Sequence, residues 1–492
     1  METFSPHFFV LTLALVGVVI MVAALLSGII DRSDVPQVGV FLALGAILGP
    51  AGLGLLDISL DSPILRVVAT LSLVLVLFTD AVSLSVAEVR RHRQLAFLVL
   101  GPGTLFSMAL IALAAWGLLG LSLPAAVTIG AALASTDPVM LRGLLKRPRL
   151  PEPVRLALRL ESGLNDGVLL PIVLVTMTLL THTNFAGIES ARLALDLFLL
   201  GPGAGVVVGL FALGALELVR RKTGVRRDYE SLYSLGVAFA AYAAAEAVHG
   251  SGYLAAFCAG LTIAALDVEL CDCFLEYGQT TAEMTLLFTF ILFGSSLIWQ
   301  GLVVLDGNTA LFAIAVVLSR PLAFFLALSR SKLDRRSRLL IAWFGPRGLS
   351  SLLLVLVPVF AGVPGTEPLF QICCLIVLLS VTLHGGSLML LGREAALPLA
   401  SNRPVAAPPK ADIKPAPDCD VTGIGERISS KELAALRASG ATMHIIDVRS
   451  DPSFASSEHL AAGALRISAD QVIGRMAELA VPRDSWIVAF CA

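Results

Sequence analysis

About thirteen apolar runs follow one another along the chain, each long enough to cross a lipid bilayer as a helix. A spanning helix needs about 20 predominantly apolar residues to cover a hydrocarbon layer ~30 Å thick. Hydrophobic residues make up 57% of the chain and charged residues only 15%, which excludes an ordinary globular protein. We expect an all-α polytopic membrane protein. The expected spans are 8–30, 36–55, 63–85, 95–119, 124–146, 153–181, 191–218, 229–248, 250–267, 281–299, 308–329, 337–361 and 367–392.

Basic residues gather in the loops after odd-numbered spans, which predicts that these loops are cytoplasmic. By this rule the N-terminus lies outside and the C-terminus lies in the cytoplasm. The acidic loop Asp267–Glu283 gives the scheme no support. The first span has no basic flank and no small-residue cleavage site, so we expect a retained helix there. The basic residues used are Arg90, Arg91, Arg93, Lys146, Arg147, Arg149, Arg220, Arg221, Lys222, Arg226, Arg227, Arg330, Lys332, Arg335, Arg336 and Arg338.

A polar cluster lies inside the apolar run 153–181. A carboxylate at the centre of a spanning helix costs about 2.5–3.5 kcal/mol on insertion scales, so it indicates a functional site. At ~100° per residue, Ser162 and Asp166 share one helix face with Asn165 beside them, whereas Glu161 points elsewhere. Serine, asparagine and aspartate offer hard oxygen ligands. The cluster can therefore hold either a small cation or a proton.

In two of the spans we expect a proline beside a charged residue to break the helix. In 124–146 the break falls at Thr136-Asp137-Pro138, with Asp137 as N-cap and Pro138 at the first helical position. A mere proline kink is the plainer alternative. In 337–361 Pro346 precedes Arg347, a buried cation for which Glu161 is the expected partner.

The two broken spans occupy corresponding places in two six-helix halves, spans 1–6 and 8–13. The odd span between the halves inverts the second relative to the first, and such paired broken helices point to a transporter's midplane site. The sequence favours neither of two interpretations of Asp80, at the end of 63–85: a functional residue, or a solvated residue at the membrane interface.

The segments 134–139, 161–167 and 345–348, in this order, resemble the bacterial NhaP-type sodium/proton antiporters of the first cation:proton antiporter family. The resemblance covers about 8–395 and implies thirteen helices with crossed unwound segments and a homodimer in the inner (plasma) membrane. It implies that Asp166 binds cation or proton and that Asn165 belongs to that site. Ser162, the backbone around Thr136, and Asp80 would supply further ligands. Glu161 and Arg347 match the family's structural ion pair.

The resemblance implies electroneutral exchange of one Na⁺, or of Li⁺ or K⁺, for one proton. Burial raises the pKa of a carboxyl group toward neutrality, so both occupants can compete near physiological pH. We expect no enzyme activity from the spans, no cofactor, no nucleic-acid partner, and no metal other than the monovalent cation. The seven cysteines indicate neither disulfides nor zinc, and His182, His249 and His384 are interpreted as ordinary interface residues rather than as sensors.

The expected domains are a transmembrane unit 1–395, a Pro/Ala-rich linker 396–424 and a cytoplasmic tail 425–492. The tail is similar to a rhodanese-like α/β domain: a strand at 444–449, a loop at 457–464, then a strand delivering Cys491. The chain ends one residue later, so we expect this domain to be partial and without sulfurtransfer activity. The alternative to antiport is a membrane-anchored sulfurtransferase or sulfur/redox sensor that acts through this tail.

Overall fold

The computed structural model describes most of the helical part of the chain and three short stretches of the tail. The described ranges are 37–84, 86–145, 150–181, 195–222, 227–266, 272–331, 333–396, 443–448, 463–467 and 485–490, with the isolated residues 17, 21 and 25. By its internal contacts the chain divides into two units, 1–399 and 400–492, and each is described by itself.

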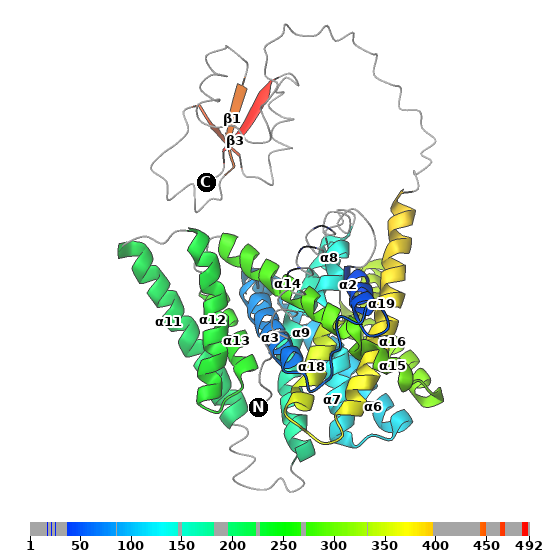
Figure 1. The fold of residues 1–492 in the computed structure, drawn as a ribbon. Coiled ribbons are helices and arrows are strands. Elements are labelled where there is room, and N and C mark those ends of the chain that lie inside the picture. The colour runs from blue at the N-terminus through cyan, green and yellow to red at the C-terminus, as the bar shows by residue number, and fades with distance from the viewer. Residues whose placement is uncertain are drawn as a thin grey trace, which may run out of the picture. The chain divides into compact units, whose positions relative to one another are not determined.

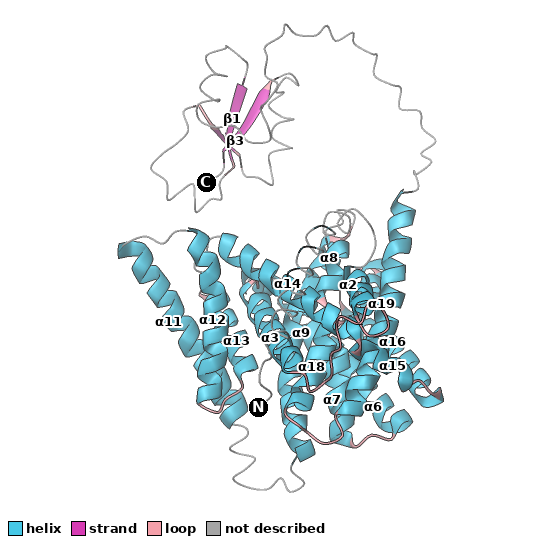
Figure 2. Cartoon of the chain, viewed as in Figure 1, coloured by secondary structure: helices cyan, strands magenta, loops and turns pink. Residues whose placement is uncertain are grey.

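The first unit consists of helices (Figures 1 and 2). Several are joined end to end by short 3₁₀ or π segments. The helices are α2 (Gln37–Leu48), α3 (Pro63–Val82), α4 (Val86–Arg91), α5 (Arg93–Leu98), α6 (Thr104–Leu119), α7 (Leu123–Ala134), α8 (Pro138–Leu145), α9 (Glu152–Thr181), α11 (Gly201–Lys222), α12 (Arg227–Ala247), α13 (Gly252–Ala265), α14 (Asp272–Ser295), α15 (Gln300–Val303), α16 (Gly307–Ala327), α17 (Arg335–Trp343), α18 (Leu349–Phe360) and α19 (Glu367–Ala396). The connecting segments are η1 (Val99–Gly103), η2 (Asp196–Leu200), η3 (Leu297–Trp299) and η4 (Leu328–Arg330).

Helices occupy twelve of the thirteen expected spans, and the span 8–30 lies almost wholly outside the described residues. Within the described part, seven helices are long and apolar enough to cross a membrane, or eight if the pair bent by 57° after Ser295 is one span. The rest are shorter. The expected span 36–55, for example, contains only the 12-residue helix α2, which ends before the glycine-rich turn at 49–54.

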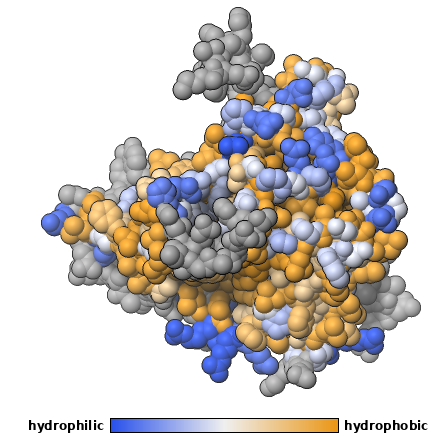
Figure 3. Space-filling view, turned by 90° about the horizontal axis from the view of Figure 1, so that it is seen from below, coloured by the Kyte–Doolittle hydropathy of each residue, from blue (hydrophilic) through white to orange (hydrophobic). Residues whose placement is uncertain are grey.

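Apolar side chains cover most of the surface seen in Figure 3, and polar ones gather in separate patches. Large hydrophobic side chains are exposed, such as Phe211 at 77% and Val303 at 83%. A soluble monomer rarely exposes so much contiguous apolar surface. The helical unit is therefore a multi-pass membrane protein.

The helices pack as two bundles. One contains α2, α3 and α11–α14, and the other contains α5–α9 and α16–α19. In the first bundle α2 and α14 approach closely at Gly45 and Gly294. A Cβ on Gly45 would lie 2.3 Å from the carbonyl oxygen of Ile291, and a Cβ on Gly294 would lie 2.3 Å from that of Leu42. Small residues at such crossings let helix backbones meet in a membrane.

Both breaks fall inside the second bundle. Backbone without helical structure separates α7 from α8 at 135–137, and α17 from α18 at 344–348. The two breaks touch, because the backbone N–H of Asp137 donates to the carbonyl of Pro346 over 3.0 Å. Irregular backbone at membrane depth is tolerated where it is buried in protein or lines a cavity.

The described stretches of the second unit form a three-stranded parallel sheet of order β2-β1-β3, with β1 at Met443–Asp447, β2 at Leu465–Arg466 and β3 at Trp486–Phe490. Strands β1 and β3 pair over their full length, from Met443 opposite Trp486 to Asp447 opposite Phe490. Residues 397–442, which include nearly all of the linker, and Cys491 lie outside the described residues.

Candidate functional site

Helix α9 carries the polar cluster into the core of the second bundle. Glu161, Ser162, Asn165 and Asp166 are all at most 4% exposed. Helix α9 is tied to α7 by Thr128, whose hydroxyl donates to the hydroxyl of Thr176 over 2.7 Å.

The break and α9 exchange two side-chain hydrogen bonds. The Ser135 hydroxyl donates to Oδ1 of Asp166. The Asn165 amide donates to Oγ1 of Thr136 over 2.8 Å. Ser135 was not singled out from the sequence, although it stands beside the residues that were; its place in the polar run before Pro138 is the signal that could have found it.

Two oxygens of this cluster, Asp166 Oδ2 and Asn165 Oδ1, are buried and accept no hydrogen bond from the residues that the structure describes. Leaving a buried acceptor unsatisfied costs about 1–3 kcal/mol, and more when it is charged. The site therefore has two oxygen ligands available for a proton or a small cation. The Thr136 hydroxyl lies beside the cluster, where it accepts from the amide nitrogen of Asn165.

Asp137 joins the two broken helices. Its Oδ1 accepts from the N–H of Val139 over 2.8 Å, and its Oδ2 accepts from the N–H of Leu349 over 2.8 Å. It thus caps α8, which begins at Pro138, and also α18. Both N-termini carry partial positive charge, which a carboxylate stabilises. Each oxygen of Asp137 thus accepts from a backbone N–H, whereas Oδ2 of Asp166 accepts from none of the described residues.

Arg347 lies at the other side of the same crossing, where it donates to the last carbonyls of α7. Its Nη1 reaches the oxygens of Ala134 and Ser135 over 2.7 and 3.1 Å, and Nη2 reaches the Ser107 hydroxyl over 3.3 Å. The break before Pro138 leaves these carbonyls without helical partners, and the guanidinium supplies their donors.

The prediction that Glu161 forms an ion pair with Arg347 is wrong, because the partner of Glu161 is Arg320. Glu161 is held by Arg320 of α16 through both terminal nitrogens, with 2.7 Å between Nη2 and Oε2. Arg320 also donates to the carbonyls of Ile341 and Phe344, over 2.9 and 3.0 Å, before the break at Pro346. A forked guanidinium can serve a carboxylate and the free carbonyls together.

Arg320 was missed, although an arginine in the middle of the apolar run 308–329 is itself a signal of a functional or structural site. The phenyl ring of Phe324, one turn away on α16, lies 4.2 Å from the centre of its guanidinium group.

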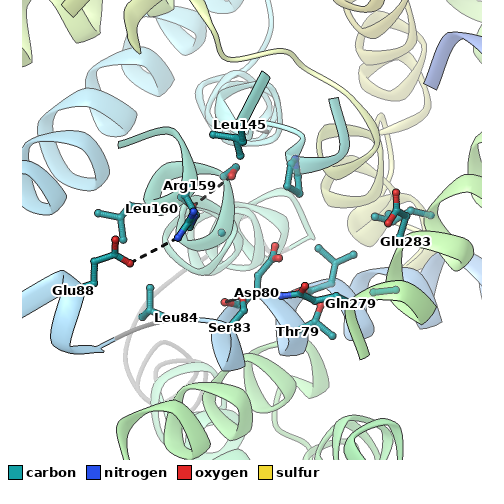
Figure 4. Close-up of a pocket in the computed structure, with 16 residues that line it drawn as sticks. Thr79, Asp80, Ser83, Leu84, Glu88, Leu145, Arg159, Leu160, Gln279 and Glu283 are labelled. Atoms are coloured by element: carbon teal, nitrogen blue, oxygen red, sulfur yellow. Dashed lines mark hydrogen bonds and ion pairs between the residues drawn. The ribbon is translucent and has the colours of Figure 1, made fainter. Parts of the chain in front are cut away.

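Ser162 and Asp80 belong to a pocket of about 370 Å³ between the two bundles (Figure 4). The Ser162 hydroxyl donates to the carbonyl of Arg159 over 3.4 Å. Asp166 lies one helical turn further along α9 and does not line this pocket among the described residues. The pocket lining is Val76, Thr79, Asp80, Ser83, Leu84, Glu88, Pro138, Leu145, Arg159, Leu160, Ser162, Gly163, Gln279, Ala282, Glu283 and Leu286.

In the described part of the chain, no group of three or more His, Cys, Asp and Glu side chains could hold a metal ion. The oxygen ligands around Asp166 suit a weakly held monovalent cation better than a resident transition metal. Of the three histidines considered in the sequence analysis, His384 is buried beside Ser380 and Trp343. His249 lies in the turn that follows α12, and His182 lies outside the described residues.

Two broken helices whose breaks meet beside a buried carboxylate, as here, are typical of secondary transporters. The family model described as "Sodium/hydrogen exchanger, transmembrane" matches residues 17–393. The chain therefore belongs to the sodium/hydrogen exchanger family.

Curated relatives include the K(+)/H(+) antiporter NhaP of Alkalimonas amylolytica, 27% identical over 389 residues, and the K(+)/H(+) antiporter NhaP2 of Shewanella sp. strain MR-4, 29% identical over 387. Each match covers 77% of this chain and 66% of the relative. The chain thus spans about two thirds of the length of these relatives.

The solved structure of the sodium proton antiporter MjNhaP1 from Methanocaldococcus jannaschii at pH 8 has a similar fold. The TM-score is 0.64 at 21% identity, and the match covers 78% of this chain and all of that one. The helical unit therefore has the NhaP fold.

Proposed function

We propose that this protein exchanges a monovalent cation for protons across the membrane, and that cation and proton compete for Asp166. The observation that carries the proposal is the pair of unpartnered buried oxygens, Asp166 Oδ2 and Asn165 Oδ1, beside the broken helix. When Asp166 is ionised, these oxygens coordinate the cation together with oxygens of Thr136 and the break. When Asp166 is protonated it is neutral, and the cation leaves.

Ser162 and Asp80 act earlier on the route of the cation. They line the pocket between the bundles, and Asp166 lies one turn deeper on α9. In this proposal the pocket is the access path, and relative movement of the two bundles closes it and opens the opposite side. The gradient of one ion drives the other, so the protein is a transporter and not an enzyme, and it needs no cofactor.

The identity of the cation is a matter for measurement. The relatives from Alkalimonas and Shewanella are named K(+)/H(+) antiporters, MjNhaP1 is a sodium proton antiporter, and a further relative from Mycobacterium bovis is named as an Na(+)/H(+) exchanger. Oxygen ligands serve Na⁺, Li⁺ and K⁺ alike, and cavity size and ligand number decide between them. Exchange of one cation for one proton is the stoichiometry we propose.

The proposed topology has thirteen crossings in two inverted halves, an outer N-terminus and a cytoplasmic C-terminus. One observation supports the weakest loop of that scheme. The start of α14, after the acidic loop, contributes Gln279 and Glu283 to the same pocket as Glu88 and Leu145. Gln279 and Glu283 thus lie near α4 and the end of α8, which supports a cytoplasmic position for the start of α14. A homodimer in the inner membrane completes the proposal.

Everted membrane vesicles from a strain without its own antiporters provide the test. Na⁺, K⁺ or Li⁺ is added to a preformed pH gradient, for the wild type and for Asp166→Asn. We expect a cation-specific collapse of the gradient that the variant abolishes, while Asp61→Asn, which removes an exposed carboxylate before α3, retains it. Clamping the membrane potential should leave the wild-type rate unchanged if exchange is one for one. Full activity of Asp166→Asn would refute the proposal.

The rhodanese-like interpretation of the tail also stays a proposal. The parallel order β2-β1-β3 fits an α/β domain, and β3 ends at Phe490, directly before Cys491. A thiosulfate:cyanide sulfurtransfer assay on the wild type and on Cys491→Ser tests it. We expect no activity in either, and cysteine-dependent activity would restore the sulfurtransferase alternative.

A further inference from the structure

The pocket between the bundles has a charged rim (Figure 4). Carboxylates reach it from three elements: Asp80 from α3, Glu88 from α4 and Glu283 from α14. Arg159 of α9 contributes a guanidinium group. Among the described residues that line the pocket, Arg159 is the only one with a positive charge.

Arg159 lies on the face of α9 that leads to the proposed cation site. Ser162 and Asp166 follow it at i+3 and i+7, so all three side chains project from one side of the helix. Seven residues correspond to a rise of about 10 Å along the axis. A cation that enters through this pocket passes Arg159 before it reaches Asp166.

Glu88 lies opposite Arg159 at the rim. Its Oε2 is 3.9 Å from Nη1 of Arg159, and the two side chains are 39% and 59% exposed. In Figure 4 the two side chains point toward each other. Such an exposed pair adds about 0–1 kcal/mol to stability, so stability does not account for an arginine on a cation path.

The balance of charge along the proposed cation path does account for the pairing of Arg159 with Glu88. Two like charges about 10 Å apart in water repel by roughly 0.4 kcal/mol, about a factor of two in local concentration, and low-dielectric pocket walls increase the effect. An unpaired Arg159 would therefore lower the concentration of cations near Asp166. Glu88, whose carboxylate faces the guanidinium, offsets this charge.

We infer that Arg159 and Glu88 form a charge gate at the mouth of the pocket, which sets the apparent affinity for the cation on the side where the pocket opens. The inference rests on the proposed exchange function and assigns the gate to residues outside the binding cluster. Because the contact is exposed, small movements of α4 relative to α9 would change the gate without repacking the core.

The experiment measures the apparent KM for the transported cation in everted vesicles, where the predicted cytoplasmic side faces the medium. Arg159→Gln should lower KM about two- to fivefold at low ionic strength, because it removes the positive charge from the path. Glu88→Gln should raise KM by a similar factor. The double variant should return close to wild type, and Arg159→Lys, which keeps the charge, should differ little from wild type.

The rate at saturating cation should stay within about twofold for all of these variants, since the gate changes the concentration of the cation and not its chemistry at Asp166. Raising the ionic strength with an impermeant salt should shrink the differences in KM. Arg336→Gln is the matched control: it removes an exposed positive charge on α17 that does not line the pocket, and KM should not change.

The inference would be overturned if Arg159→Gln and Glu88→Gln left KM unchanged or shifted it in the same direction. It would also be overturned if the KM of the double variant did not return toward the wild-type value. A loss of maximal rate at unchanged KM would show a structural role instead, and would overturn it as well. The proposed function fails separately: in that case the wild type itself shows no cation-dependent proton movement.

Discussion

Oδ2 of Asp137 accepts a hydrogen bond from the backbone N–H of Leu349, 212 residues further along the chain. One carboxylate thereby caps two helices, α8 and α18, whose N-termini meet at the crossing of the two breaks. At the opposite side of the crossing, Arg347 supplies donors to the last carbonyls of α7. The partial charges of the helix ends at this crossing are thus compensated by Asp137 and Arg347. Asp166 keeps one oxygen that accepts no hydrogen bond from the described residues.

The close contact at this crossing leads to a first prediction, on Gly348. A Cβ at this position would lie 2.0 Å from Oδ2 of Asp137, so Gly348→Ala must displace the carboxylate from the N-terminus of α18. Loss of a cap costs about 0.5–2 kcal/mol, to which the overlap adds. We expect a lower melting temperature in detergent and loss of most exchange activity.

Gly214→Ala is the control, because no heavy atom lies within 4 Å of the added Cβ on α11. Its melting temperature should be unchanged or slightly higher, since alanine favours a helix interior over glycine by about 0.5–1 kcal/mol. Equal behaviour of the two variants would show that the Asp137 contact contributes nothing to folding or transport.

Part of the cause of the two breaks is local, because Pro138 and Pro346 each lack a backbone N–H and stand beside a charged residue inside an apolar run. This local signal is not sufficient, because Arg320-Pro321 shows the same pattern and lies inside the continuous helix α16. The placing of the buried cluster on α9 is local as well, since the helical repeat alone sorts Ser162, Asn165 and Asp166 onto neighbouring positions.

The partner of Glu161 could not be derived in this way. Arg320 and Arg347 both stand inside apolar runs, and the choice between them depends on how α9, α16 and α18 pack. That packing is a property of tertiary structure, which single-helix geometry leaves open. Likewise, the hydropathy of 36–55 does not reveal that α2 ends after 12 residues, because the turn that follows is also apolar.

A second prediction concerns pH and the start of α16. Asp306 caps this helix: its Oδ1 accepts from the N–H of Thr309 over 2.7 Å, and this hydrogen bond lowers the pKa of the carboxyl group from its ordinary value of 3.8. A group whose pKa is lower in the folded state stabilises the fold above the unfolded pKa, and the effect is lost as pH falls through the folded pKa.

Wild type should therefore melt above Asp306→Asn at neutral pH. The difference should begin to shrink as pH falls past the ordinary value of 3.8, and it should disappear once pH falls below the lowered pKa of the folded state. Melting curves in detergent from pH 7 to pH 3 check this. A difference that persists or grows in acid would mean that the ionised carboxylate is not the stabilising species.

A third prediction separates two charged residues of α9, Glu161 and Arg159, by burial. Glu161→Gln leaves the guanidinium of Arg320 buried without its counter-charge, and breaking a buried pair in this way costs about 3–5 kcal/mol. Arg320→Gln should be at least as harmful, because the carbonyls of Ile341 and Phe344 also lose their donor. Arg159→Gln removes an exposed charge from the same helix as Glu161, and it should leave the melting temperature unchanged.

The last prediction decides between the two arginines as partners of Glu161. In a double-mutant cycle, residues in contact show coupling energies of about 0.5–3 kcal/mol, whereas residues without shared partners add. We expect the cycle of Glu161→Gln with Arg320→Gln to give strong coupling, since each single variant strands a buried charge and the double variant strands none. The cycle of Glu161→Gln with Arg347→Gln should be closer to additive, because Arg347 bonds to Ala134, Ser135 and Ser107 instead. Stronger coupling to Arg347 than to Arg320, measured by thermal unfolding in the same detergent, would contradict the pairing in this structure.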